Sequence, residues 1–351
     1  MITYNSDDAL TFTVPVQSGC TLPTLSEVQS YSFGGYGSGI SAIGIQQSAK
    51  KSLAIFVKTS SNTWGVLLGN EFQPQIYRGQ NKDFPMFSSS YARLSNDFSR
   101  MIAQIQREEF REFFVKTAYY KRCREFSVLD CKYDFDFEAI FQHYGFASLY
   151  IDITKDLLTA LFFAYTYTKD GHYYPCENFD EYNPTLYVSF IFPLEKKSRK
   201  TVVPISFQTL GRPLKQMAMA LDAKEIDYKP YFAKYSLPKD PYIAIDVYEK
   251  FSGGDALFPK EPVADTAKMI LISKELNSKL VRRICSENNV DADAFEAELL
   301  ANNYNVSEIE WSVTDDMNVY MNDEIDRLWL PLLDSISLRR TSPIVRSAGY
   351  D

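Results

Sequence analysis

Histidine and paired cysteines are scarce in this sequence. It has two histidines, His143 and His172, and its five cysteines lie at irregular spacings without a Cys-x-x-Cys pair. We therefore expect no zinc or other transition-metal site, although a hard cation held by carboxylates stays open. An odd number of unpaired thiols is typical of a reducing compartment, which predicts a cytoplasmic protein.

Long apolar runs and an excess of basic residues are absent as well. The opening residues MITYNSDDAL carry acids where a signal peptide has bases, and no run reaches the roughly 18 apolar residues of a transmembrane helix, so we expect no membrane association. Acidic residues number 45 against 37 lysines and arginines, a net charge of -8. This balance argues against a broad basic face for duplex nucleic acid. A single strand could still stack on some of the 24 tyrosines and 25 phenylalanines.

The apolar residues that are present, 45% of the chain, suffice for a substantial core. Residues 53–57 and 64–68 flank a turn-like segment as the strands of a hairpin would. Beyond them, extended and helical patterns interleave, with strands expected at 75–79, 149–153, 185–193 and 267–273, and helices at 98–122, 135–144, 155–167, 275–285, 292–302 and 323–330. This order predicts an α+β fold in which helices pack on a mixed sheet core.

Three regions follow from these patterns. They are a β-rich N-terminal segment over 1–71, a core domain over 72–285 and an acidic helical C-terminal region over 286–351. Between Ile284 and Asp326 the chain has twelve acidic residues and no lysine or arginine. The acidic segment 286–326 is therefore either a solvated helical face or a docking surface for a basic partner protein.

The strand that ends in Tyr77-Arg78-Gly79 offers a candidate anion site. A guanidinium next to a glycine, where backbone can approach a ligand closely, suits bidentate binding of a phosphate or a carboxylate. An ordinary ion pair of Arg78 is the competing interpretation.

Further polar residues surround a predicted strand–turn–helix unit. His143 lies at the end of the helix 135–144, where the helix C-terminus favours a protonated imidazole. Asp152 and Thr154 flank Ile153 at the end of the strand 149–153. Either of them could cap the helix that follows, which is the structural alternative to a role in a site.

Taken together, these segments resemble the FRG domain, a family named for a Phe/Tyr-Arg-Gly signature. The resemblance spans about residues 72–280. It is carried by Tyr77-Arg78-Gly79 followed by Gln80, Phe84-Pro85 and Arg93, by Gln142-His143-Tyr144-Gly145, by Ser148-Leu149-Tyr150-Ile151-Asp152-Ile153-Thr154, by Ala160-Leu161-Phe162-Phe163-Ala164, and by Arg212 with Gln216. The chain departs from the family pattern at Leu149, where the family has arginine, and at Ala218 and Ala220, where it has glycine and phenylalanine.

The order of these motifs is also similar to that of ADP-ribosyltransferases, which implies an ADP-ribosyltransferase-like fold with NAD as the substrate. The resemblance implies catalysis by His143, Asp152 and Gln216, and contacts to NAD from Tyr77, Arg78, Gly79, Tyr144, Thr154 and Arg212. Gln216 stands where such enzymes place a glutamate. An amide can orient a reacting group but cannot deprotonate it.

These resemblances predict a toxin or antiphage-defence effector that ADP-ribosylates a protein or a nucleic acid, with single-stranded nucleic acid as a candidate acceptor. The alternative is a non-catalytic sensing or protein-binding module of a bacterial defence or toxin–antitoxin system. Such a module would bind an antitoxin or another basic partner through the acidic segment 286–326. A third hypothesis is a nuclease or other hydrolase with a carboxylate-bound metal.

Overall fold

The computed structural model describes residues 42–46, 53–58, 63–67, 75–125, 127–128, 131–133, 135–190, 202–204, 210–223, 227–324, 327 and 340–341. Its central sheet has the strand order β11 (Val202–Pro204), β12 (Ala218–Asp222), β7 (Tyr150–Thr154), β4 (Gln75–Gln80), β10 (Thr185–Phe190) and β13 (Ala233–Ser236). Every neighbouring pair is antiparallel. The mixture of helices with a β-sheet core is confirmed, whereas the expectation of a mixed central sheet is wrong.

The two faces of this sheet carry side chains of different size. One face presents large apolar residues that pack with Phe87, Tyr228 and Phe232 into a buried cluster, namely Ile76, Ile151, Ile153, Tyr187, Met219 and Leu221. The other face presents Gly79, Ala218 and Ala220 to helices. Small side chains there let α4 (Phe137–His143) and α5 (Leu157–Tyr165) approach the strands closely.

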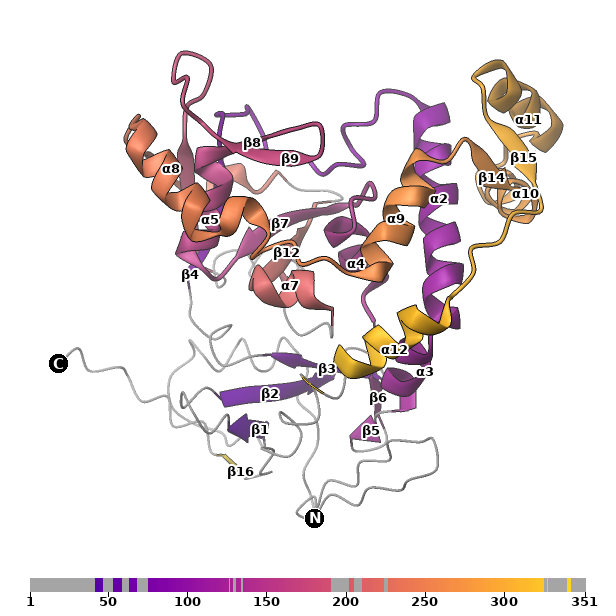
Figure 1. The fold of residues 1–351 in the computed structure, drawn as a ribbon, viewed down its shortest axis with the longest axis horizontal. Coiled ribbons are helices and arrows are strands. Elements are labelled where there is room, and N and C mark those ends of the chain that lie inside the picture. Colours follow the sequence, from indigo (N-terminus) through magenta and orange to yellow (C-terminus); the bar gives the residue numbers. More distant parts are fainter. Residues whose placement is uncertain are drawn as a thin grey trace.

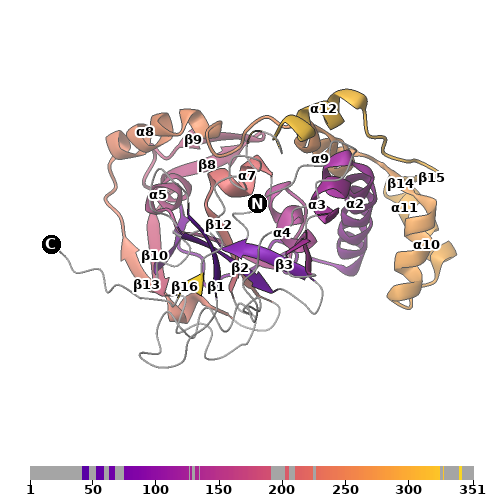
Figure 2. The same ribbon diagram turned by 90° about the horizontal axis from the view of Figure 1, so that it is seen from below.

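Helices flank the sheet at both ends. α8 (Pro241–Lys250) packs against α5 at one end, and α2 (Asp97–Lys116), α4 and α9 (Pro262–Ile272) lie at the other (Figures 1 and 2). The expected single helix 98–122 is two helices, because Thr117 donates its hydroxyl to the Phe114 carbonyl and ends α2 before α3 (Ala118–Glu125) begins.

An aspartate caps the N-terminal end of each of the helices α4 and α5. Asp136 caps α4 by accepting from the Ala139 amide at 3.0 Å, and Asp156 caps α5 by accepting from the Thr159 amide at 2.8 Å. The expected caps Asp152 and Thr154 are both on β7 instead. After α5 the chain enters the hairpin of β8 (Thr166–Lys169) and β9 (His172–Pro175), so the predicted helix 155–167 is shorter than expected.

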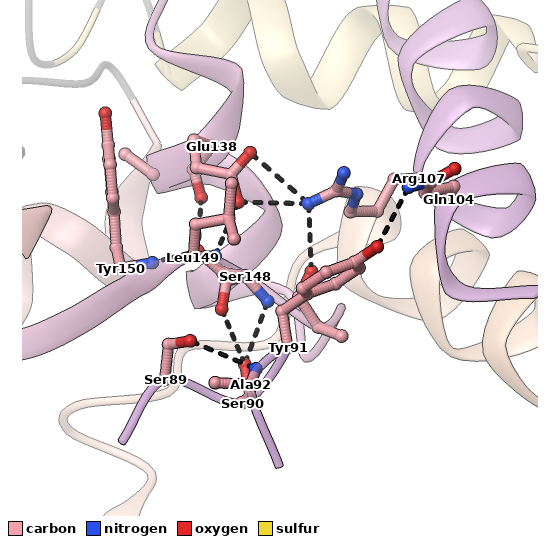
Figure 3. A network of polar contacts seen from close by, with 12 residues as sticks. Ser89, Ser90, Tyr91, Ala92, Gln104, Arg107, Glu138, Ser148, Leu149 and Tyr150 are labelled. Carbon is pink, nitrogen blue, oxygen red and sulfur yellow. Dashed lines mark hydrogen bonds and ion pairs between the residues drawn. The ribbon is translucent and has the colours of Figure 1, made fainter. Parts of the chain in front are cut away.

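A polar network fixes the start of β7 against α2 and α4 (Figure 3). Arg107 of α2 forms an ion pair with Glu138 of α4 at 3.0 Å, and Glu138 accepts from the Leu149 amide at 2.7 Å. The Ser148 amide donates to the Ser90 hydroxyl at 2.8 Å, which ties β7 to the loop before α2. Since these groups are largely shielded from solvent, the network holds β7 in one position.

Beyond α9 lies a small unit on the far side of α2 (Figure 1). β14 (Glu275–Asn277) and β15 (Asn305–Ser307) pair in parallel, and α10 (Ser278–Glu287) and α11 (Ala292–Ala301) connect them. The helix expected at 292–302 is confirmed, the one expected at 275–285 begins after β14, and the expected domain boundary at 285 and 286 falls within α10. The domain division itself stays a prediction.

One other expectation in the C-terminal half is wrong, and another lies mostly outside the described residues. Residues 267–273, expected as a strand, lie in α9 up to Ile272, where Val263, Ala267 and Ile270 are buried at helical spacing. The last described helix, α12 (Asp315–Glu324), begins eight residues before the helix expected at 323–330, most of which lies outside the described residues.

A second sheet is formed by short strands in the order β16 (Arg340–Thr341), β1 (Ala42–Gln46), β2 (Leu53–Lys58), β3 (Thr63–Leu67), β6 (Cys131–Tyr133) and β5 (Ser127–Val128). The predicted hairpin is confirmed, since β2 and β3 pair in antiparallel fashion. No helix within the described ranges is long and apolar enough to cross a membrane.

Candidate functional site

A cavity opens where two neighbouring strands of the central sheet separate. β4 and β7 pair at a single position, Tyr77 opposite Thr154, and no further backbone pairs join them. Beyond that point Arg78 to Gln80 run on one side of the opening and Asp152 and Ile153 on the other. The cavity has a volume of about 700 Å³, which suits a small-molecule ligand.

Most of the predicted site residues line this cavity. They are Tyr77, Arg78, Gly79, His143, Asp152, Thr154 and Gln216. Three sequence segments that are far apart along the chain therefore meet in one concavity. Tyr144 and Arg212 are not among the lining residues. The chemical roles of all nine residues stay predictions.

Arg78 reaches across the gap between the two strands. Its Nη1 donates to the backbone carbonyl of Asp152, and its guanidinium carbon lies 5.3 Å from the centre of the Phe87 ring. Its Nε is buried without a hydrogen-bond partner, and no described carboxylate forms an ion pair with it. Burial lowers the pKa of Arg78, while the nearby Asp152 opposes that effect. The ion-pair interpretation therefore does not hold among the described residues, and donors remain for an anionic ligand.

Asp152 supplies the one carboxylate among the described residues that line the cavity. Gln142 donates to its Oδ2 at 2.8 Å, and its Oδ1 is buried without a hydrogen-bond partner. Arg78 and Arg93 are the cationic side chains of the lining. The cavity thus has an excess of positive charge with a single acceptor carboxylate, which suits a ligand that has both an anionic group and a hydrogen-bond donor.

His143 is buried at the end of α4, with 6% of its surface exposed. Burial lowers the pKa of its imidazole, although Asp152 and the Gln216 side chain act in the opposite direction. The expectation of a histidine favoured in its protonated form is therefore wrong, since desolvation outweighs the helix C-terminus. Its Nε2 is buried without a hydrogen-bond partner, so the neutral ring has a nitrogen left for a ligand.

The lowered pKa of His143 predicts a loss of stability in mild acid. The unfolded chain takes up a proton near the ordinary value of 6.5, while the folded chain resists it to a lower pH. Stability is then fully present above about pH 6.5 and falls as the pH drops below it. We expect His143→Gln to lose less of its unfolding free energy between pH 7 and pH 5 than the wild type, as measured by urea titrations.

The exposed His172 gives the matched control, because His172→Gln should retain the pH dependence of the wild type. Equal slopes for the wild type and His143→Gln over this range would contradict the prediction.

Thr154 and Gln216 hold the inner wall of the cavity together. The Thr154 hydroxyl donates to the Gln216 carbonyl at 2.8 Å and accepts from the Asp156 amide at 2.9 Å. The Gln216 side chain donates to the Leu257 carbonyl at 3.1 Å and also contacts His143. Gln216 therefore orients its neighbours through its amide, and it has no group that could act as a base.

Tyr144 and Arg212 form a layer behind the cavity. The buried Tyr144 hydroxyl donates to Glu261, and burial followed by that carboxylate raises the pKa of Tyr144 well above its ordinary value. The Arg212 guanidinium covers the Tyr144 ring at 5.1 Å and donates to the His143 carbonyl at 3.4 Å. Both residues thus support the end of α4, and the expected direct contacts of Tyr144 and Arg212 to NAD do not follow from their placement.

The departures from the family pattern lie mainly outside the cavity. Leu149 is not a lining residue, and its amide binds the Glu138–Arg107 pair instead (Figure 3). Ala220 packs against Ala139 of α4. Ala218 alone of the three lines the cavity, where its small side chain leaves room. Leu149, which stands in the place of the family's strand arginine, therefore contributes nothing to the lining.

Several lining residues were missed by sequence reasoning about the site. Gln80 follows the Tyr-Arg-Gly motif, and strand alternation places it on the face of Arg78. The rim is formed by side chains of the loop after β4 and of the β8–β9 hairpin, including Phe84, Met86, Tyr167 and Tyr173. Gln80 and Phe84 follow the Tyr-Arg-Gly motif in the family pattern, which could have identified both, but no local signal marks Met86, Tyr167 or Tyr173.

Comparison with known proteins gives a match for one segment of the chain. Neither curated proteins nor solved structures give a match. Residues 73–172, which include Arg78, His143, Asp152 and Thr154, match the family model of the FRG domain and support the assignment of this segment to that family.

Proposed function

We propose that the cavity binds NAD and that the protein transfers ADP-ribose from it, as a cytoplasmic toxin or antiphage-defence effector. The observation that carries the proposal is the pairing of Arg78, with a partnerless buried Nε, and Asp152, with a partnerless Oδ1, across one opening of suitable size. A dinucleotide offers both an anionic pyrophosphate for the guanidinium and ribose groups for the carboxylate.

The proposed reaction breaks the bond between C1′ of the ribose and the nicotinamide nitrogen. The bonding electrons leave with nicotinamide, and positive charge develops on the ribose ring. The Asp152 carboxylate stabilises that charge through space. An acceptor nucleophile of a protein or a single-stranded nucleic acid then forms the new bond to C1′, and its proton passes to Asp152 or to solvent. Gln216 positions His143 and does not take part in proton transfer.

Substituting Asp152 tests this mechanism without removing the anion site. We expect Asp152→Asn to bind NAD within a few-fold of the wild type, because Arg78 is retained. Its rate of nicotinamide release should fall roughly 100-fold or more, since the neutral amide lacks the charge that stabilises the cation. Calorimetry measures the affinity, and chromatography measures released nicotinamide. Unchanged release in the variant would contradict the role of Asp152.

The second candidate is a non-catalytic module that senses NAD or a related nucleotide. It is favoured by Gln216, whose amide occupies the place of a catalytic glutamate and is already bonded to the Leu257 carbonyl. Wild-type protein that binds NAD but releases no nicotinamide with any acceptor would select this candidate. In that case the acidic segment 286–326 is the docking surface we propose for an antitoxin or another basic partner. Part of its charge is engaged already, since Glu287, Glu296 and Glu310 form ion pairs within the chain.

A further inference from the structure

The cavity has two chemically different ends along β4. Arg78 donates to the carbonyl of Asp152, whose carboxylate lies near His143, whereas Gln80 lies at the end of the strand, where the loop with Phe84 and Met86 begins. Gln80 is two positions after Arg78, which corresponds to about 7 Å along β4. The carboxylate end faces α4, because Gln142 donates to Asp152, whereas the Gln80 end is on the opposite face of the sheet with Arg78 and Phe87.

Gln80 has the features of a ligand-binding side chain. It is 9% exposed, it lines the cavity, and its Oε1 is buried without a hydrogen-bond partner. Buried amide oxygens in folded proteins nearly always accept a hydrogen bond. A bound molecule that places an N–H or O–H group at this end of the cavity would donate the hydrogen bond that Gln80 Oε1 lacks.

The rim beside Gln80 is suited to a planar ring. Phe84 and Met86 are 46% and 52% exposed, although both are large and apolar. On the facing side Tyr167 stacks on Tyr182, with ring centres 4.9 Å apart and an interplanar angle of 16°. The loop is joined to β8 because the Asn81 side chain donates to the Thr166 carbonyl at 2.8 Å. These contacts fix the positions of the two sides of the rim relative to each other. The exposed apolar surface of Phe84 and Met86 is then free to be covered by a base.

We propose that the adenosine half of NAD binds at the Gln80 end. Gln80 Oε1 accepts a hydrogen bond from a ribose hydroxyl or from the amino group of adenine, and the adenine ring covers Phe84 and Met86. This assignment rests on the proposed function, since transfer requires the nicotinamide ribose beside Asp152. The pyrophosphate then lies at Arg78, between the two halves. The reverse orientation would leave the cavity's carboxylate beside adenosine, away from the bond that breaks.

The two halves of NAD can be tested separately by calorimetry with ADP and with nicotinamide mononucleotide. Gln80→Leu keeps the size of the side chain and removes the acceptor. We expect it to weaken ADP binding roughly 3- to 10-fold, which is the usual effect of one buried hydrogen bond, and to change nicotinamide mononucleotide binding less than two-fold. Gln104→Leu is the matched control, because Gln104 lies outside the cavity on α2. It should leave both affinities unchanged.

ADP analogues then identify the group that donates to Gln80. We compare 2′-deoxy-ADP, 3′-deoxy-ADP and inosine diphosphate, each of which lacks one candidate donor. The analogue without the bonded donor should bind the wild type several-fold more weakly than ADP, but should match ADP in Gln80→Leu. If every analogue binds the wild type with the affinity of ADP, Gln80 accepts a hydrogen bond from none of these groups and the assignment is overturned.

The remaining outcomes separate this inference from the proposed function. A loss of nicotinamide mononucleotide binding in Gln80→Leu, with ADP unaffected, would show the reverse orientation. An equal loss for both would show that Gln80 does not distinguish the halves, and either result overturns the inference while NAD binding stands. No binding of NAD by the wild type would overturn the proposed function itself. Thermal unfolding of each variant checks that it is folded.

Discussion

Arg78→Leu is expected to lower the affinity for NAD about 100-fold and to abolish measurable nicotinamide release. Hydrogen bonds from a guanidinium to an anion contribute more than neutral ones, roughly 1.5–3 kcal/mol each, and about 2.8 kcal/mol corresponds to a factor of 100. The loss is large because the lining has few other donors of this kind. Arg93, the second arginine, is exposed and already donates to the Ser88 carbonyl at 2.7 Å.

Two further variants show whether charge or geometry matters. Arg78→Lys keeps the charge but cannot bind a phosphate with two parallel donors, so its affinity should lie between those of the wild type and Arg78→Leu. Arg100→Leu is the control for the loss of an arginine, because Arg100 pairs with Asp97 at 2.9 Å outside the cavity. NAD affinity near the wild-type value in a folded Arg78→Leu protein would remove the anion site from consideration.

The meeting of distant segments at this cavity could be predicted because each carries a local signature. Tyr77-Arg78-Gly79 lies near the end of a strand, His143 ends a helix, and Asp152 and Thr154 lie on a strand that leads into a helix. These elements have clear patterns of spacing, and the resemblance to a family supplied the expectation that they come together. Seven of the ten segments expected beyond residue 70 begin within two residues of an observed element of the same type, and these carry Arg78, His143, Asp152 and Thr154.

The environment of each side chain could not be read from the sequence. The state of His143 depends on burial by residues from several elements, and this burial outweighs the helix terminus that local reasoning considered. The opening between β4 and β7 depends on a register with one paired position, which hydrophobic patterns do not encode. Tyr144 follows His143 in the Gln-His-Tyr-Gly motif, yet its hydroxyl donates to Glu261 behind the cavity.

The apolar run 267–273 shows why short segments mislead. Its residues fit a buried strand and a buried helix equally well by composition. Pro262 at the first turn and Val263, one helical turn before Ala267, favour the helix α9, and both of these residues precede the run. Thr117 likewise divides a continuous helical pattern through a hydroxyl bond to the preceding turn.

Gly79→Ala is expected to destabilise the fold by roughly 3 kcal/mol or more. A Cβ at this position would lie 1.7 Å from the Ala160 carbonyl oxygen and 2.8 Å from the Ala164 nitrogen, both of them backbone atoms of α5. Neither can rotate away, so α5 must shift off β4. Overpacking of a core costs about 1–3 kcal/mol when side chains can adjust, and backbone contacts of this kind lie at the upper end or above it.

Gly171→Ala is the matched control, because a Cβ there meets no atom within 4 Å. Gly171 has a φ of +76° in the β8–β9 turn, so alanine should cost only the strain of that conformation, about 1 kcal/mol. Urea unfolding monitored by circular dichroism gives both values. The comparison also separates two roles for Gly79. If the glycine served only to admit a ligand to the backbone, Gly79→Ala would be as stable as Gly171→Ala and would lose NAD affinity alone. Because α5 carries Thr159 and Phe163 into the cavity, we expect stability and affinity to fall together.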